Sequence, residues 1–145
     1  MGHPKDIGDR STLAVMLGLQ AAGYQLLVPF GENTRYDLAI ERDGRLSRVQ
    51  CKTGRLQNGA VLFKTASTYS HHPRPAATMR SYHGEIDYFA VYCPATGSVY
   101  LIPFEEAPNR STAALRVEPS RNCQQKRVRH AADYEIATVP LTTAT

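Results

Sequence analysis

The stretch from Arg35 to Lys52 reads RYDLAIERDGRLSRVQCK and is the strongest fold signal in the chain. It consists of two short runs of alternating apolar and polar residues that meet at Asp43-Gly44. An Asp-Gly pair between such runs is typical of a β-hairpin, because both central residues of its turn need positive φ. The stretch therefore predicts a hairpin whose strands cover about 35–42 and 46–53.

A two-residue turn also fixes which side chains share a face of the hairpin. Asp37 then lies opposite Gln50, and Leu38 lies opposite Val49. Because side chains two apart on a strand point the same way, Asp37, Gln50 and Lys52 project together, within roughly 5–8 Å of one another. A centred four-residue loop would keep this register, whereas a three-residue loop would break it.

These three polar side chains suit a divalent cation such as Mg²⁺, which prefers oxygen ligands. Asp37 offers a carboxylate, Gln50 an amide carbonyl and Cys51 a main-chain carbonyl. Lys52 could orient an attacking water or help to deprotonate it, and could offset the charge of a phosphate. The alternative is a solvated hairpin face with three unrelated polar residues, and the spacing alone does not separate the two interpretations.

Size and charge set wide bounds on function. The 145 residues suit one domain with a single core. Seventeen Lys and Arg against thirteen Asp and Glu give a net charge of +4. This mild excess is compatible with a polyanionic partner and equally with an ordinary basic protein.

Cysteine usage and the N-terminus bear on location. Cys51, Cys93 and Cys123 are widely spaced and form neither a metal-site pattern nor a disulfide framework. The N-terminal MGHPKDIGDR has no apolar leader, and no apolar run has the length of a membrane span. We therefore expect a cytoplasmic protein with no membrane partner.

The rest of the chain predicts an α/β domain with a mixed sheet. A helix is expected from Asp9 or Ser11 to about Ala22, with Gly23 as its stop. Further strands are expected over 24–28, 60–65, 85–93, 98–102 and 115–117, with one helical turn in 103–108. Residues 66–84 show no regular period and predict a long irregular loop.

This order of elements predicts a single domain over residues 9–136. A flexible lead is expected over 1–8 and a frayed tail over 137–145.

A leading helix, a loop ending in RYD and then VQCK on the partner strand resemble the PD-(D/E)xK nuclease superfamily. The run GDRSTLAVMLGLQAAGYQLLVPFGENTRYDLAIERDGRLSRVQCKTGR resembles its group I intron-associated endonuclease branch, which is marked by Tyr-Asp and by Gln in place of an acid. The later GEIDYFAVYCPATGSVYLIP and NCQQKRVRHAADYE are similar to the same branch. The resemblance covers most of residues 8–135.

The resemblance implies a restriction-endonuclease-like core with a mixed β-sheet and a leading helix. It also implies hydrolysis of DNA phosphodiesters with Mg²⁺, or with Mn²⁺ in its place, by a chain that acts alone or as a homo-oligomer. By matching position, Asp37 would be the metal-binding carboxylate, Gln50 the second ligand and Lys52 the motif lysine.

One position departs from the family pattern. Thr12 stands where the family usually has a Glu in the leading helix. Because Gln50 is also neutral, Asp37 alone brings formal charge among the matched positions, which predicts weak metal affinity or a compensating acid. The candidates for that acid are Asp9, Glu32 and Glu41.

Several residues could contact nucleic acid, mostly by placing a cation against a phosphate. They are Arg35, Tyr36, Arg48, Arg55, Lys64, Lys126, Arg127 and Arg129. The last three belong to the basic segment 121–130, which could also be an exposed basic tail.

Three functions follow from these observations. The first is a Mg²⁺-dependent DNA endonuclease. The second, favoured by Thr12, is a catalytically impaired nuclease-fold module that binds DNA. The third is a basic α/β domain that binds RNA or protein.

Overall fold

A computed structural model describes residues 3–31, 34–69, 78–107, 111–119 and 128–136. Its centre is a five-stranded sheet in the order β1-β2-β3-β8-β9. The strands are β1 (Gln25–Leu27), β2 (Leu38–Arg42), β3 (Arg45–Thr53), β8 (Tyr88–Cys93) and β9 (Ser98–Pro103). The β3–β8 pair is parallel and the other pairs are antiparallel, so the expected mixed sheet is confirmed.

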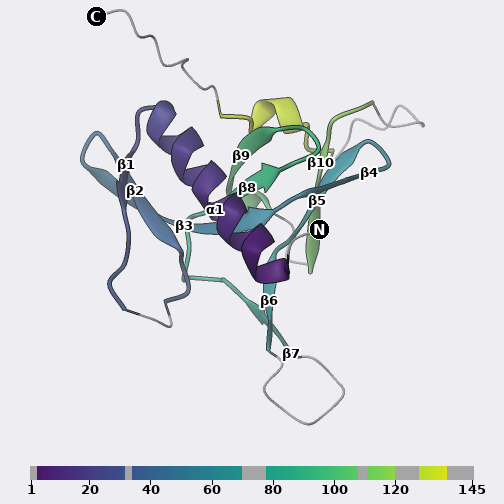
Figure 1. Ribbon diagram of the computed structural model, residues 1–145. Coiled ribbons are helices and arrows are strands. Elements are labelled where there is room, and N and C mark those ends of the chain that lie inside the picture. Colours follow the sequence, from purple (N-terminus) through teal and green to yellow (C-terminus); the bar gives the residue numbers. More distant parts are fainter. Residues whose placement is uncertain (1–2, 32–33, 70–77, 108–110, 120–127, 137–145) are drawn as a thin grey trace, which may run out of the picture.

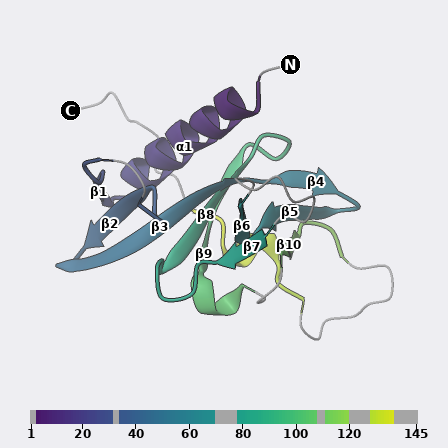
Figure 2. The same ribbon diagram turned by 90° about the horizontal axis from the view of Figure 1, so that it is seen from below.

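The domain has three layers (Figures 1 and 2). Helix α1 (Pro4–Ala21) covers one face of the five-stranded sheet, where Val15 and Leu19 are fully buried among apolar side chains of β2, β3 and β8. A second sheet in the order β10-β5-β4 packs against the opposite face. Its strands are β4 (Arg55–Gln57), β5 (Ala60–Lys64) and β10 (Thr112–Arg116). The central sheet thus has a buried core on each side.

The leading helix begins earlier than the sequence predicts. Pro4 occupies the first turn, where a missing N–H costs nothing. The His3 side chain caps the helix by accepting a hydrogen bond from the Lys5 N–H at 3.2 Å. The expected flexible lead over 1–8 is therefore wrong for residues 4–8, which are helical.

The central hairpin has the predicted turn and register. Asp43 and Gly44 take φ values of 54° and 78°, as a two-residue turn of this kind requires. Leu38 pairs with Val49, as the two-residue turn predicted.

The segment 66–84 contains more regular structure than expected. β6 (Ala66–Tyr69) and β7 (Thr78–Ser81) form an antiparallel ribbon that extends away from the three layers (Figure 1). The alternating pattern is weak here because this pair belongs to neither core sheet. The expectation of one irregular loop is thus wrong for these two strands.

Smaller differences concern short elements. β4 was not predicted, and β10 begins before the expected 115–117. The helical turn expected in 103–108 is present as the 3₁₀ helix Phe104–Glu106, and a second one covers Ala131–Asp133. No helix in the described part of the chain is long and apolar enough to cross a membrane.

Candidate active site

Asp37 lies directly before β2, at the end of the hairpin away from the turn. Its main-chain N–H donates to the Val49 carbonyl at 2.9 Å, although Val49 already pairs with Leu38, so the regular register ends at the Leu38–Val49 pair. The position of Asp37 opposite Gln50 stays a prediction. Its carboxylate Oδ2 accepts a hydrogen bond from the Cys51 N–H at 2.8 Å. At Cys51 the hydrogen-bond partner of the β3 main chain is thus the Asp37 side chain and not the main chain of β2.

The Cys51 carbonyl faces the same side. In a β-strand the N–H and C=O of one residue point in the same direction. Because the Cys51 N–H points at the Asp37 carboxylate, the Cys51 carbonyl also points towards Asp37 and away from β8. Two of the three predicted metal ligands therefore lie on one side of β3.

Gln50 and Lys52 project from the sheet face opposite to α1. Gln50 pairs with Phe89 and Lys52 with Val91, and both of these apolar residues belong to the core under the second sheet. Lys52 Nζ donates a hydrogen bond to the Tyr82 hydroxyl at 3.0 Å. Gln50 and Lys52 thus share one face of the sheet, and Tyr82 anchors Lys52 there. That Asp37 projects from the same face stays a prediction.

The environment of Asp37 opposes its negative charge. Desolvation of its carboxyl raises the pKa of Asp37 above its ordinary value, although the residue as a whole is exposed, so this effect is modest. The Cys51 N–H and the positive charge of Lys52 both lower this pKa, but less than burial raises it. A nearby cation would therefore stabilise the ionised form of this carboxylate.

The Cys51 thiol is a core group. Burial, followed by the negative charge of Asp37, raises its pKa to about 12, while a hydrogen bond with Thr12 and the charge of Lys52 act in the other direction. A thiol with so high a pKa is a poor ligand and a poor nucleophile. Cys51 can therefore contribute to a metal site through its main chain.

Thr12 lies next to this group of residues. Its hydroxyl donates to the Gly8 carbonyl at 3.0 Å and is within hydrogen-bonding reach of the Cys51 thiol. The first-helix position is thus beside the β3 segment that contacts Asp37, but it carries no charge.

The three candidate compensating acids differ in position. Glu41 is four residues along β2 from Asp37, which is about 13 Å, too far to share a cation. Asp9 lies one turn before Thr12 on α1 and shares its side of the helix. Glu32 lies outside the described residues. Within the described ranges, no three His, Cys, Asp or Glu side chains gather as a metal site.

Two of the predicted DNA-contacting arginines are paired with carboxylates. Arg35 Nε lies 3.0 Å from Glu85 Oε2, and Arg48 Nε lies 3.2 Å from Asp87 Oδ2. Burial disfavours ionisation of Asp87, but hydrogen bonds and charge from Arg48 outweigh it and lower the Asp87 pKa. Tyr36 packs against the core under the second sheet.

Arg55 and Lys64 lie close to the site instead. Together with Lys52 they line a pocket of about 280 Å³ whose walls also include Gly54, Phe63 and Thr112. Among the described residues that line it, none is acidic. This cationic pocket, defined by Lys52, Arg55 and Lys64, is a concave surface suited to a phosphate.

The basic C-terminal segment is described only in part. Arg129 lies near the Tyr134 hydroxyl, and its carbonyl accepts from the Arg116 N–H at 2.7 Å. Lys126 and Arg127 lie outside the described residues.

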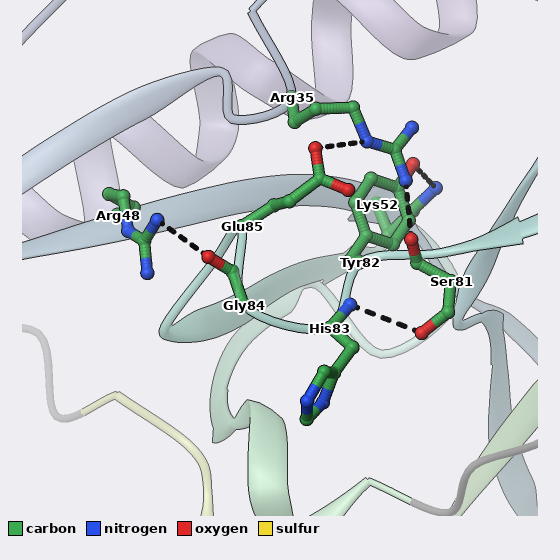
Figure 3. A network of polar contacts seen from close by, with 8 residues as sticks. All are labelled: Arg35, Arg48, Lys52, Ser81, Tyr82, His83, Gly84 and Glu85. Atoms are coloured by element: carbon green, nitrogen blue, oxygen red, sulfur yellow. Dashed lines mark hydrogen bonds and ion pairs between the residues drawn. The ribbon is translucent and has the colours of Figure 1, made fainter.

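Tyr82 is a site residue that the sequence did not reveal. It lies directly after β7, in the segment that predicted an irregular loop, and contacts both Lys52 and Arg35 (Figure 3). No local pattern marks it, because its partners are distant in sequence.

A mixed sheet covered by a helix, with Asp37, Gln50 and Lys52 on the β2–β3 hairpin, is the architecture of restriction-endonuclease-like nucleases. The chain belongs to the PD-(D/E)XK endonuclease family, whose model matches residues 2–137. The chain is similar in structure to the bacterial homing endonuclease I-Ssp6803I, with a TM-score of 0.74 and 22% identity over 92% of this chain and 89% of that one. At this identity the likeness shows a shared fold. The comparison with curated proteins gave no match.

Proposed function

We propose that this protein is a Mg²⁺-dependent DNA endonuclease. Its active site, formed by Asp37, Gln50 and Lys52, would hydrolyse phosphodiester bonds, with Mn²⁺ able to replace Mg²⁺. The observation that carries the proposal is the position of the Asp37 carboxylate, which the Cys51 N–H holds near the charge of Lys52, a residue that lines the cationic pocket. Family membership supports an endonuclease, and DNA is the substrate that this family implies.

The residues present fit a hard divalent cation. Asp37 supplies a carboxylate, Gln50 an amide and Cys51 a carbonyl on the side of β3 that faces Asp37. All three are oxygen donors, and a site with few protein ligands suits an ion that keeps several waters. Burial of Asp37 adds a reason for a cation there, because its negative charge is otherwise disfavoured.

Lys52 has the clearest chemical role. In hydrolysis, a water oxygen adds to phosphorus, one P–O bond breaks and the leaving oxygen takes up a proton. A bound divalent cation would supply Lewis acidity and favour ionisation of water. The Lys52 ammonium can orient the attacking water and offset charge that develops on the phosphate oxygens.

DNA binding would rest on the cationic pocket. Arg55 and Lys64 are exposed and share this pocket with Lys52, so a phosphate bound there would lie next to the proposed site of cleavage. Arg35 and Arg48 already form ion pairs with carboxylates, so we expect them to contribute less to DNA binding than Arg55 and Lys64.

A second function is favoured by Thr12. With Thr12 and Gln50 both neutral, Asp37 alone supplies charge among the matched positions, and the chain would then bind DNA without cutting it.

The proposal also includes a homo-oligomer and membership of the intron-associated branch. A cytoplasmic location is also proposed, because Cys51 and Cys93 are free thiols.

The decisive assay incubates supercoiled plasmid and branched DNA with the protein and Mg²⁺, Mn²⁺ or EDTA. We expect metal-dependent nicking that Lys52→Ala reduces to a slow residual rate and that Lys5→Ala, a matched change at an exposed lysine of α1, leaves intact. Salt-sensitive DNA binding without cutting in either metal would support the second function. Failure to bind DNA at low salt would refute both functions and leave a domain that binds RNA or protein.

A further inference from the structure

We propose that Tyr82 is a positioning residue that aims the Lys52 ammonium at the reacting phosphate. This inference rests on the proposed function, because it concerns how Lys52 performs its part in cleavage. It adds a residue from a different part of the chain, at a position that the PD-(D/E)xK motif does not include.

The contact between the two side chains is direct. Lys52 Nζ donates to the Tyr82 hydroxyl at 3.0 Å and lies 4.8 Å from the centre of the Tyr82 ring. An ammonium group has three N–H donors and no acceptor, so the tyrosine oxygen must accept. One N–H is thereby committed to Tyr82, which sets the directions of the other two.

Tyr82 is itself held rigidly (Figure 3). It is only 4% exposed, and its ring packs edge-on against Phe89 with centroids 5.7 Å apart. The Arg35 guanidinium lies 4.0 Å from the ring centre and is fixed in turn by Glu85 at 3.0 Å and by the Ser81 carbonyl at 2.8 Å. A lysine has many rotamers, so a rigid acceptor is an effective way to hold its end in one place.

Tyr82 acts through Lys52 and not on the substrate. Its burial leaves little surface for contact with DNA, whereas Lys52 lines the cationic pocket. Loss of the hydroxyl should therefore slow the chemical step and leave DNA binding unchanged.

The first test is Tyr82→Phe, which keeps the ring and removes the hydroxyl. We expect the cleavage rate at saturating DNA to fall roughly 10- to 100-fold, as for the loss of one hydrogen bond to a charged group, with DNA affinity within about twofold of wild type. Tyr100→Phe is the matched control. Tyr100 is 3% exposed and its hydroxyl is 3.0 Å from Thr96 Oγ1, so this change removes a similar buried hydrogen bond away from Lys52.

The second test combines Tyr82→Phe with Lys52→Ala. If Tyr82 works through Lys52, the double variant is as slow as Lys52→Ala alone. A further loss of rate in the double variant would show a general structural role and overturn the inference. Cleavage by Tyr82→Phe at the wild-type rate would also overturn the inference.

A third readout does not depend on activity. The chain has four lysines, so the ¹⁵N signal of the Lys52 ammonium can be assigned as the one that Lys52→Ala removes. We expect this signal in wild type and in Tyr100→Phe, and its loss through fast exchange with water in Tyr82→Phe. If the wild type never cuts DNA, the proposed function and the catalytic role of Tyr82 both fail. If it cuts and the Lys52 signal is the same in Tyr82→Phe, only this inference fails.

Discussion

Asp37 combines two opposed requirements. A cation-binding carboxylate has to be ionised, yet burial raises the pKa of Asp37 despite the hydrogen bond from Cys51 and the charge of Lys52. Between its unfolded and its raised folded pKa, the folded protein binds more protons than the unfolded chain. The contribution of Asp37 to stability therefore falls as the pH rises through this window, and at neutral pH the ionised group opposes folding.

The first prediction is that Asp37→Asn raises the melting temperature at pH 7 in EDTA. Asn keeps an oxygen that can accept from the Cys51 N–H but carries no charge, so the rise should be small for this exposed residue. Added Mg²⁺ should stabilise the wild type, by about 2.7 kcal/mol at 100 times its dissociation constant, and leave the variant unchanged. Differential scanning fluorimetry at several pH values measures both effects.

The matched control for this prediction is Asp43→Asn, in the exposed hairpin turn, where Asn-Gly is equally favourable. It should alter neither the pH dependence nor the response to Mg²⁺. A lower melting temperature for Asp37→Asn at pH 7 in EDTA would contradict the account of Asp37.

Helix α1 places a neutral group where a charge would complete the site. The second prediction is that Thr12→Glu tightens Mg²⁺ binding by about tenfold, or ~1.4 kcal/mol, because it adds a carboxylate close to Cys51, whose N–H contacts Asp37. Isothermal titration calorimetry with Mg²⁺ provides the measurement. Leu13→Glu adds the same charge at a neighbouring position that is 66% exposed and should have little effect. Equal affinities for the two variants would show that Thr12 does not face the cation.

The end of β3 depends on a close approach that only glycine allows. A Cβ at Gly54 would lie 2.6 Å from Val61 Cγ1 and 2.9 Å from Val91 Cγ1, in contact with both sheets. The third prediction is that Gly54→Ala destabilises the protein by about 1–3 kcal/mol, as for an overpacked core. Urea unfolding measures this loss.

Gly8→Ala is the matched control, since a Cβ there meets nothing within 4 Å and the residue lies in α1. It should be neutral or stabilise the helix by up to about 1 kcal/mol. Equal stability of the Gly54→Ala variant and the wild type would mean that the two sheets are less tightly packed at this point.

The sequence predicted those elements that local patterns encode. The Asp43-Gly44 turn determines the hairpin register through neighbours only, and so the pairing of Leu38 with Val49 was accessible from the sequence. The β6–β7 ribbon was missed because it has no alternating pattern. Tyr82 was missed because its contact with Lys52 joins residues 30 positions apart.

At the scale of the whole molecule, charge is distributed unevenly around the site. The arginines at 35 and 48 are paired with carboxylates, while the cationic pocket presents Arg55, Lys64 and Lys52 without an acidic residue among its described lining. The net charge of +4 alone could not locate this pocket, because it depends on how the two sheets meet.

The fourth prediction concerns the salt dependence of DNA binding. The double variant Arg55→Ala/Lys64→Ala should weaken binding and reduce the slope of log K against log salt by about 1.8, since two phosphate contacts are lost. The variant Lys5→Ala/Arg45→Ala removes the same charges from exposed positions on α1 and the hairpin and should reduce it less. Fluorescence anisotropy over a range of salt concentrations distinguishes them. Equal slopes for the two double variants would show that the cationic pocket is not the main contact.

The most direct test of the central claim is the cleavage rate of a radiolabelled DNA duplex at saturating protein in Mg²⁺, measured for wild type, Asp37→Asn and Arg55→Ala/Lys64→Ala. If Asp37 belongs to the site of cleavage and the cationic pocket binds DNA, Asp37→Asn binds normally and does not cut, whereas the double variant binds weakly and still cuts once saturated. Cleavage by Asp37→Asn at the wild-type rate would contradict the assignment of the active site.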